Sequence, residues 1–100
     1  MDIEDFQNDV LRPIIKSLHD FIIQIADESI EIKPQKVSEI RDLIEQKIKS
    51  DYVLKNILIG AVLSKMSTEN LKWFFENRKE SSKRISNIIS KRIFDTYYPS

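Results

Sequence analysis

Hydrophobic side chains recur at helical spacing along almost the whole chain. The first stripe runs from Ile3 to Ile25 at intervals of three and four residues, which places these side chains on one face of an α-helix. The stripe keeps its phase across Pro13. An internal proline kinks a helix, whereas a proline in the first turn begins one. We therefore predict one helix over residues 3–28 with a kink near Pro13; the alternative is a short helix followed by a second that begins at Pro13.

The second predicted helix covers residues 35–49. The polar stretch from Asp27 to Pro34 interrupts the first stripe. Pro34 suits the first turn of a new helix, and isoleucine and leucine then return at intervals of three and four residues.

The third predicted helix covers residues 52–65, with Ser50 or Asp51 as its N-cap. Its side chains are apolar almost all round, which is typical of a helix in the middle of a bundle. Gly60 lies within it, although a glycine inside a helix costs about 1 kcal/mol relative to alanine. We interpret Gly60 as the point where the backbone of a neighbouring helix approaches closely.

The last predicted helices cover residues 68–80 and 82–97. Ser67 and Asn70 form an N-cap pair at the start of the first, and the apolar stripe resumes at Ile85 after a polar stretch. That polar stretch also fits one continuous helix. Short loops favour antiparallel neighbours. The pattern thus predicts one all-α domain over residues 1–100, a compact bundle of four or five antiparallel helices.

The amino-acid composition limits the classes of binding partner and the cellular location that we expect for this protein. The chain is 41% hydrophobic and 32% charged, as expected of a globular domain, and its net charge is zero. A neutral chain lacks the positive excess of a dedicated nucleic-acid or membrane-surface protein, and it has little repulsion between copies, which favours self-association. The acidic N-terminus and the lack of a long apolar stretch predict a cytoplasmic protein without a membrane segment.

Few residues offer catalytic or metal-binding chemistry. Cysteine is absent, and the single histidine, His19, has no second metal ligand three or four residues away on its helix. The carboxylates of Glu39, Asp42 and Glu45 share one face with basic neighbours, as on a solvated helix surface. A single glycine cannot form a glycine-rich phosphate loop. We therefore expect no enzyme activity, no metal and no cofactor.

The run Trp73-Phe74-Phe75 points to a binding surface. Three consecutive helical residues span about 200°, so a narrow core face cannot cover all of them. We expect Phe74 and Phe75 to point inward and Trp73 to tilt toward the rim. Either the helix is wide and well covered, or Trp73 anchors a partner or a second subunit, as aromatic side chains often do at interfaces. Residues 51–100 carry nine basic and five acidic side chains, against seven and eleven in residues 1–50. The predicted partner-binding residues are Trp73, Asn77, Arg78, Lys79, Lys83 and Arg84.

Residues 67–79 resemble the recognition helix of homeodomains. Phe74 stands at the family's tryptophan position, Phe75 and Asn77 match the following phenylalanine and asparagine, and Arg78 and Lys79 match the basic pair. The resemblance implies insertion of this helix into the DNA major groove. The segment departs from that pattern at its base-facing positions, where Glu76, Glu80 and Trp73 stand.

These observations predict a non-enzymatic helical protein-interaction module, an adaptor, inhibitor or regulatory subunit that also self-associates. The alternative is nucleic-acid or nucleotide binding through the basic segment 72–92.

Overall fold

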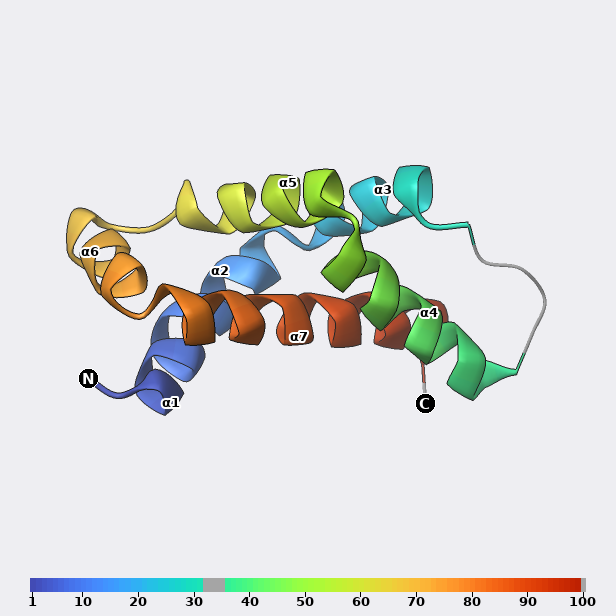
Figure 1. The fold of residues 1–100 in the computed structure, drawn as a ribbon, viewed down its shortest axis with the longest axis horizontal. Coiled ribbons are helices and arrows are strands. Elements are labelled where there is room, and N and C mark those ends of the chain that lie inside the picture. Colours follow the sequence, from blue (N-terminus) through green and yellow to red (C-terminus); the bar gives the residue numbers. More distant parts are fainter. Residues whose placement is uncertain (32–35, 100) are drawn as a thin grey trace.

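The computed structural model describes residues 1–31 and 36–99, and all regular structure in them is helical (Figure 1). The predicted all-α class is therefore confirmed. The elements are α1 (Ile3–Phe6), a π-helical turn (Gln7–Leu11), α2 (Arg12–Ser17), α3 (His19–Ser29), α4 (Val37–Ser50), α5 (Tyr52–Leu63), α6 (Thr68–Glu76) and α7 (Arg78–Tyr97). The predicted count of four or five helices is not confirmed.

The N-terminal segment, residues 3–17, contains a π turn before Pro13 and is followed by a break at Leu18. The backbone N–H of Arg12 bonds to the carbonyl of Gln7, five residues back, which makes the turn before Pro13 a π turn. A proline lacks an N–H and clashes with the carbonyl four residues earlier, and a wider turn relieves that crowding. Leu18 leaves the helical region, with φ −98° and ψ 12°. The π turn before Pro13 is an irregularity close to the predicted kink, but a single helix over 3–28 is wrong, because the chain breaks at Leu18.

Two of the predicted N-caps are confirmed. The Asp51 carboxylate accepts a hydrogen bond from the Leu54 backbone N–H (3.0 Å), and the Ser67 hydroxyl accepts one from the Asn70 N–H (3.2 Å). The hydrogen bond from Leu54, with the nearby ammonium of Lys47, lowers the pKa of Asp51. The expectation that Pro34 lies in the first turn of the second helix falls outside the described residues. The predicted start of that helix at residue 35 is wrong, because Lys36 is extended (φ −65°, ψ 146°) and α4 begins at Val37.

The predicted boundary between the last two helices is wrong. Asn77 has φ −128° and ψ 35°, so α6 ends at Glu76 and α7 begins at Arg78. The polar stretch after residue 76 therefore belongs to the first turns of α7, and residues 68–80 do not form one helix.

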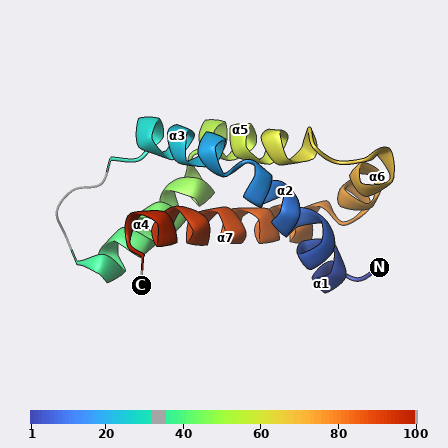
Figure 2. The same ribbon diagram turned by 180° about the vertical axis from the view of Figure 1, so that it is seen from behind.

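Helix α7 is the centre of the fold. It contacts α2 to α6 and the π turn, and its most extensive contact is with α4. Figures 1 and 2 show α5 alongside α7 in the opposite direction, whereas α4 crosses α7 obliquely. The antiparallel arrangement is thus not confirmed for the domain as a whole. Buried isoleucines of α7 alternate with buried serines, whose small side chains permit close packing; these residues are Ser81, Ile85, Ser86, Ile89, Ser90 and Ile93.

The prediction that residues 52–65 form the central helix is wrong. Leu54, Leu58 and Val62 of α5 are buried, but Tyr52 and Val53 on its other face are 74% and 71% exposed. Gly60 is also exposed, and a Cβ built on it would meet nothing within 4 Å. No neighbouring backbone among residues 1–31 and 36–99 explains this glycine.

Candidate functional site: a basic groove

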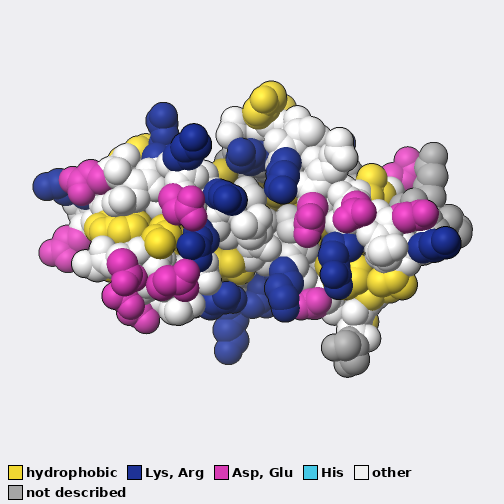
Figure 3. Space-filling model, turned by 60° about the horizontal axis from the view of Figure 1, so that its bottom comes forward, with side chains coloured by type: hydrophobic (Ala, Val, Ile, Leu, Met, Phe, Trp, Pro, Cys, Tyr) yellow, Lys and Arg dark blue, Asp and Glu magenta, His cyan; other side chains and the backbone are white. Residues whose placement is uncertain are grey.

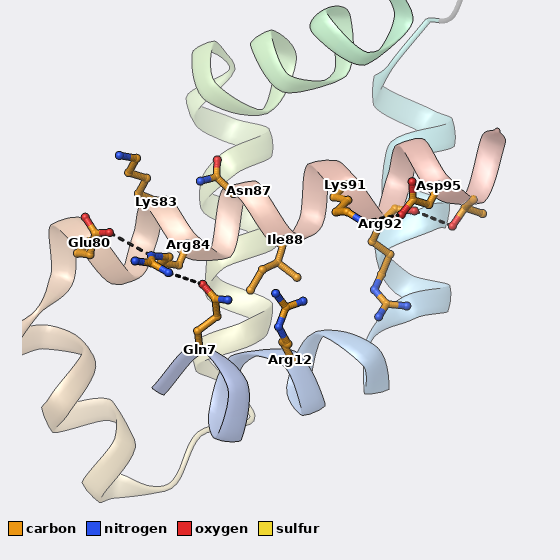
Figure 4. A pocket seen from close by; sticks show the side chains of 11 residues that line it. Gln7, Arg12, Glu80, Lys83, Arg84, Asn87, Ile88, Lys91, Arg92 and Asp95 are labelled. Carbon is orange, nitrogen blue, oxygen red and sulfur yellow. Dashed lines mark hydrogen bonds and ion pairs between the residues drawn. The ribbon is translucent and has the colours of Figure 1, made fainter. Parts of the chain in front are cut away.

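A groove of about 620 Å³ lies between α7 and the N-terminal segment (Figure 4). Residues at intervals of three and four along α7 form one wall, and Gln7 and Arg12 rise from the opposite wall toward Arg84 and Ile88. This volume lies in the range of natural ligand sites, about 300–1,000 Å³. The lining residues are Gln7, Arg12, Glu80, Lys83, Arg84, Asn87, Ile88, Lys91, Arg92, Asp95 and Thr96.

Two of the five cations in the groove are neutralised by carboxylates. Arg84 binds Glu4 (Nη1 to Oε1, 2.8 Å) and Glu80 (Nε to Oε1, 3.1 Å), and its Nη1 also donates to the side-chain oxygen of Gln7 (2.9 Å). These hydrogen bonds, with Glu4 first, raise the pKa of Arg84. Lys91 pairs with Asp95 at 3.4 Å. Arg84 therefore links α7 to the N-terminal segment at that end of the groove.

The other three cations, Arg12, Lys83 and Arg92, have no carboxylate within 4 Å among residues 1–31 and 36–99. A second hollow of about 380 Å³ shares Arg12 and Arg92 with the groove and adds Lys16. Figure 3 shows the dark-blue side chains gathered over the middle of this face, with acidic side chains toward both ends. The groove consequently carries a local positive charge, although the whole chain is neutral.

Arg92 is held in place by His19. Its Nη1 lies 3.2 Å from the His19 Nδ1, and its buried Nε has no hydrogen-bond partner among the described residues. A guanidinium only donates, so Nδ1 is the acceptor and the imidazole proton lies on Nε2. His19, predicted as a structural residue at the edge of an apolar stripe, thus contacts the groove through Arg92.

The groove suits an elongated anion with some apolar surface. Its cations follow α7 from Lys83 to Arg92, and Ile88 offers an apolar contact between them. The side-chain amides of Gln7 and Asn87 add neutral hydrogen-bonding groups. No aromatic side chain lines it, so a nucleic-acid base would find no stacking platform there.

Two of the six predicted partner-binding residues line the groove, and the other four lie outside it. Lys83 and Arg84 line the groove. Trp73 is half-buried and stacks on Phe6 with ring centroids 4.3 Å apart, so much of its ring is covered within the chain. The exposed aromatic of α6 is Phe75, at 59%, which was expected to point inward.

The remaining predicted residues lie at the junction between α6 and α7. The Asn77 side-chain amide donates to the Trp73 backbone oxygen (3.0 Å), and it thereby caps the end of α6. Arg78 and Lys79 are exposed in the first turn of α7 and do not line the groove. Because the chain bends at Asn77, residues 67–79 lack the continuous helix that the homeodomain resemblance implies.

Sequence reasoning missed Arg12 as a groove residue. The basic side chains of α7 carry a visible signal, since Lys83, Arg84, Lys91 and Arg92 recur near intervals of seven and eight residues. Arg12 lies about 70 positions earlier, and only the packing of the N-terminal segment on α7 brings it opposite them.

Within the described residues, no helix is both long and apolar enough to cross a membrane, and no three His, Asp or Glu side chains gather as metal ligands. Comparison with protein-family models, with curated proteins and with solved structures finds no match to this chain.

Proposed function

We propose that this chain is a non-enzymatic protein-interaction module that binds an acidic segment of a partner protein in the groove between α7 and the N-terminal segment. The observation that supports it is the set of three cations, Arg12, Lys83 and Arg92, that face one groove without carboxylate partners among the described residues. Carboxylates of a partner would complete these ion pairs.

The length of the groove favours a polypeptide over a small anion. The lining residues of α7 extend from Glu80 to Thr96, which at the helical rise is roughly 24 Å. An acidic helix of similar length, with carboxylates on one face and an aliphatic residue against Ile88, matches both the charge and the apolar contact.

Nucleic acid is the alternative ligand and is less well supported. Glu80 and Asp95 line the groove, and Glu4 borders it through Arg84, so a continuous phosphate backbone would meet carboxylates. Arginine and lysine contacts to phosphates would also need a larger positive excess than a neutral chain provides.

Fluorescence anisotropy tests this proposal with a labelled helical peptide of about 15 residues, in which glutamates and one central leucine occupy the same helical face and neutral polar residues the other. We expect binding at low salt that weakens as salt is added, because the contacts are between charges. Arg12→Ala combined with Lys83→Ala should weaken binding roughly 2- to 30-fold, since exposed ion pairs contribute about 0.2–1 kcal/mol each.

A matched control is Lys72→Ala combined with Lys79→Ala, which removes two exposed cations from outside the groove. This variant should bind the peptide like the unmodified protein. Equal losses in both double variants, or no peptide binding at low salt, would overturn the proposal. Tighter binding of a labelled single-stranded DNA of comparable length, with loss in the groove variant, would replace it with the nucleic-acid alternative.

A further inference from the structure

We propose that the outer face of α5 is a self-association surface, on which two copies of this chain pair through antiparallel α5 helices. This surface is separate from the basic groove and does not depend on the function proposed for it. The α5 face is defined by Tyr52, Val53, Asn56, Ile57, Gly60 and Ser64, all of which are exposed.

The α5 face is apolar and carries no charged side chain. Tyr52, Val53 and Ile57 are among the large hydrophobic residues that the fold leaves exposed, with Ile57 at 44%. Between them stand only the neutral side chains of Asn56 and Ser64. Lys55, the one charged residue of α5, lies off this face and is half-buried. An uncharged apolar helix face on the outside of a domain is typical of an interface.

Gly60 gives this surface a specific shape. It has open space where a Cβ would lie and no positive φ, so neither packing inside the chain nor backbone conformation requires glycine there. A glycine in an exposed helix is unfavourable on its own, but it lets a second helix approach closely. In an antiparallel pair centred between Ile57 and Gly60, the isoleucine of each copy lies over the glycine of the other.

The lack of charge on the α5 face favours a second copy of this chain as its binding partner. A two-fold interface brings the same patch against itself, so any charge at its centre would meet a like charge. The α5 face avoids that repulsion because it is uncharged, and the neutral chain adds no long-range repulsion between copies. A partner recognised by charge would find no group to pair with on this face.

Sedimentation velocity over a concentration series tests the proposal, with Val53→Glu and Gly60→Leu as variants. We expect a monomer–dimer equilibrium in the unmodified protein and a dissociation constant raised about tenfold or more in each variant. Val53→Glu places a carboxylate in the apolar contact, where it loses water without gaining a partner on the α5 face. Gly60→Leu blocks the close approach while replacing glycine with a better helix former, so weaker association could not be attributed to unfolding.

The control is Val37→Glu, which makes the same change at a valine that is 52% exposed on α4. It should leave the dissociation constant within about twofold of the unmodified value. A monomer at every concentration would overturn the proposal. So would a dimer that Val53→Glu and Gly60→Leu leave unchanged, or one that Gly60→Leu tightens.

Discussion

Replacing Ser81 by alanine should stabilise the fold, although Ser81 is completely buried. Its side chain is 0% exposed, and its hydroxyl has no hydrogen-bond partner among the described residues. The neighbouring residue Ser82 is only half-buried, lies on the same helix and therefore provides a matched control. The two substitutions delete the same atom in different surroundings.

The expected gain has two parts. Alanine is a better helix former than serine by about 0.5 kcal/mol, and this part applies to both positions. A buried hydroxyl that loses its bonds to water without replacing them costs about 1 kcal/mol or more. We therefore expect the free energy of unfolding to rise by about 1.5 kcal/mol for Ser81→Ala and by about 0.5 kcal/mol for Ser82→Ala.

Thermal unfolding followed by circular dichroism measures this difference. A change of 1 kcal/mol moves the melting temperature of a domain of this size by roughly 4–8 °C, so the two variants should separate clearly. A melting temperature that falls in Ser81→Ala would show that the hydroxyl makes a stabilising bond. Equal gains in both variants would show that burial of the hydroxyl carries no cost.

Three further predictions concern α5, α6 and the end of α7. Gly60→Ala should raise the free energy of unfolding by about 1 kcal/mol, because the added methyl group meets nothing within 4 Å; urea unfolding at low protein concentration measures it, and a loss would contradict the open surroundings of Gly60. Ser67→Ala should lower the free energy of unfolding by about 1 kcal/mol, because the hydrogen bond to the Asn70 N–H is lost; an unchanged urea midpoint would refute this capping role. Burial and the hydrogen bond to Asp27 raise the pKa of Tyr97 to about 12, above the value of about 10 in the unfolded chain, so the stability that the phenol contributes is present below pH 10 and is lost as pH rises toward 12. The urea midpoint should therefore fall more steeply between these pH values than in Tyr97→Phe, and parallel curves would exclude the shift.

The parts of the fold that depend on residues close together in the sequence were predictable from the sequence. Asp51 and Ser67 cap their helices through side-chain hydrogen bonds to backbone N–H groups three residues away. The residues that form each cap therefore stand close to one another in the sequence, where they can be recognised. The helical periodicity likewise predicts the all-α class, because the spacing of apolar residues reports which face is buried.

How deeply each helix is buried was not predictable, because burial depends on which helices pack against one another in the folded chain. Helix α7 has a lower apolar content than α5, yet it is central: its serines Ser86 and Ser90 are buried, and it makes its most extensive contact with α4. Helix α5 is apolar almost all round, and its outer face is exposed within the described part of the chain. The stacking of Trp73 was not predictable for the same reason, since its partner Phe6 lies in the N-terminal segment.

The candidate site contains residues that were predictable from the sequence and residues that only the fold brings together. Lys83 and Arg84 were predicted because a basic cluster on one helix is visible in the sequence, whereas Arg12 and the counter-ion Glu4 come from the other end of the chain. The sequence therefore shows which residues carry charge. It does not show that Arg84 is neutralised while Lys83 and Arg12 are left without carboxylate partners among the described residues.

The two proposed surfaces lie on opposite sides of α7. Helix α5 runs above α7 in Figure 1, and the basic groove opens on the face that Figure 3 turns toward the viewer from below. A dimer joined through α5 would therefore leave both grooves open, and each copy could hold an acidic segment. Two linked sites bind a partner with two acidic segments more tightly than one site does, if the spacing allows both to bind. Because the surfaces do not overlap, the groove variant should dimerise normally and Val53→Glu should bind a single peptide normally.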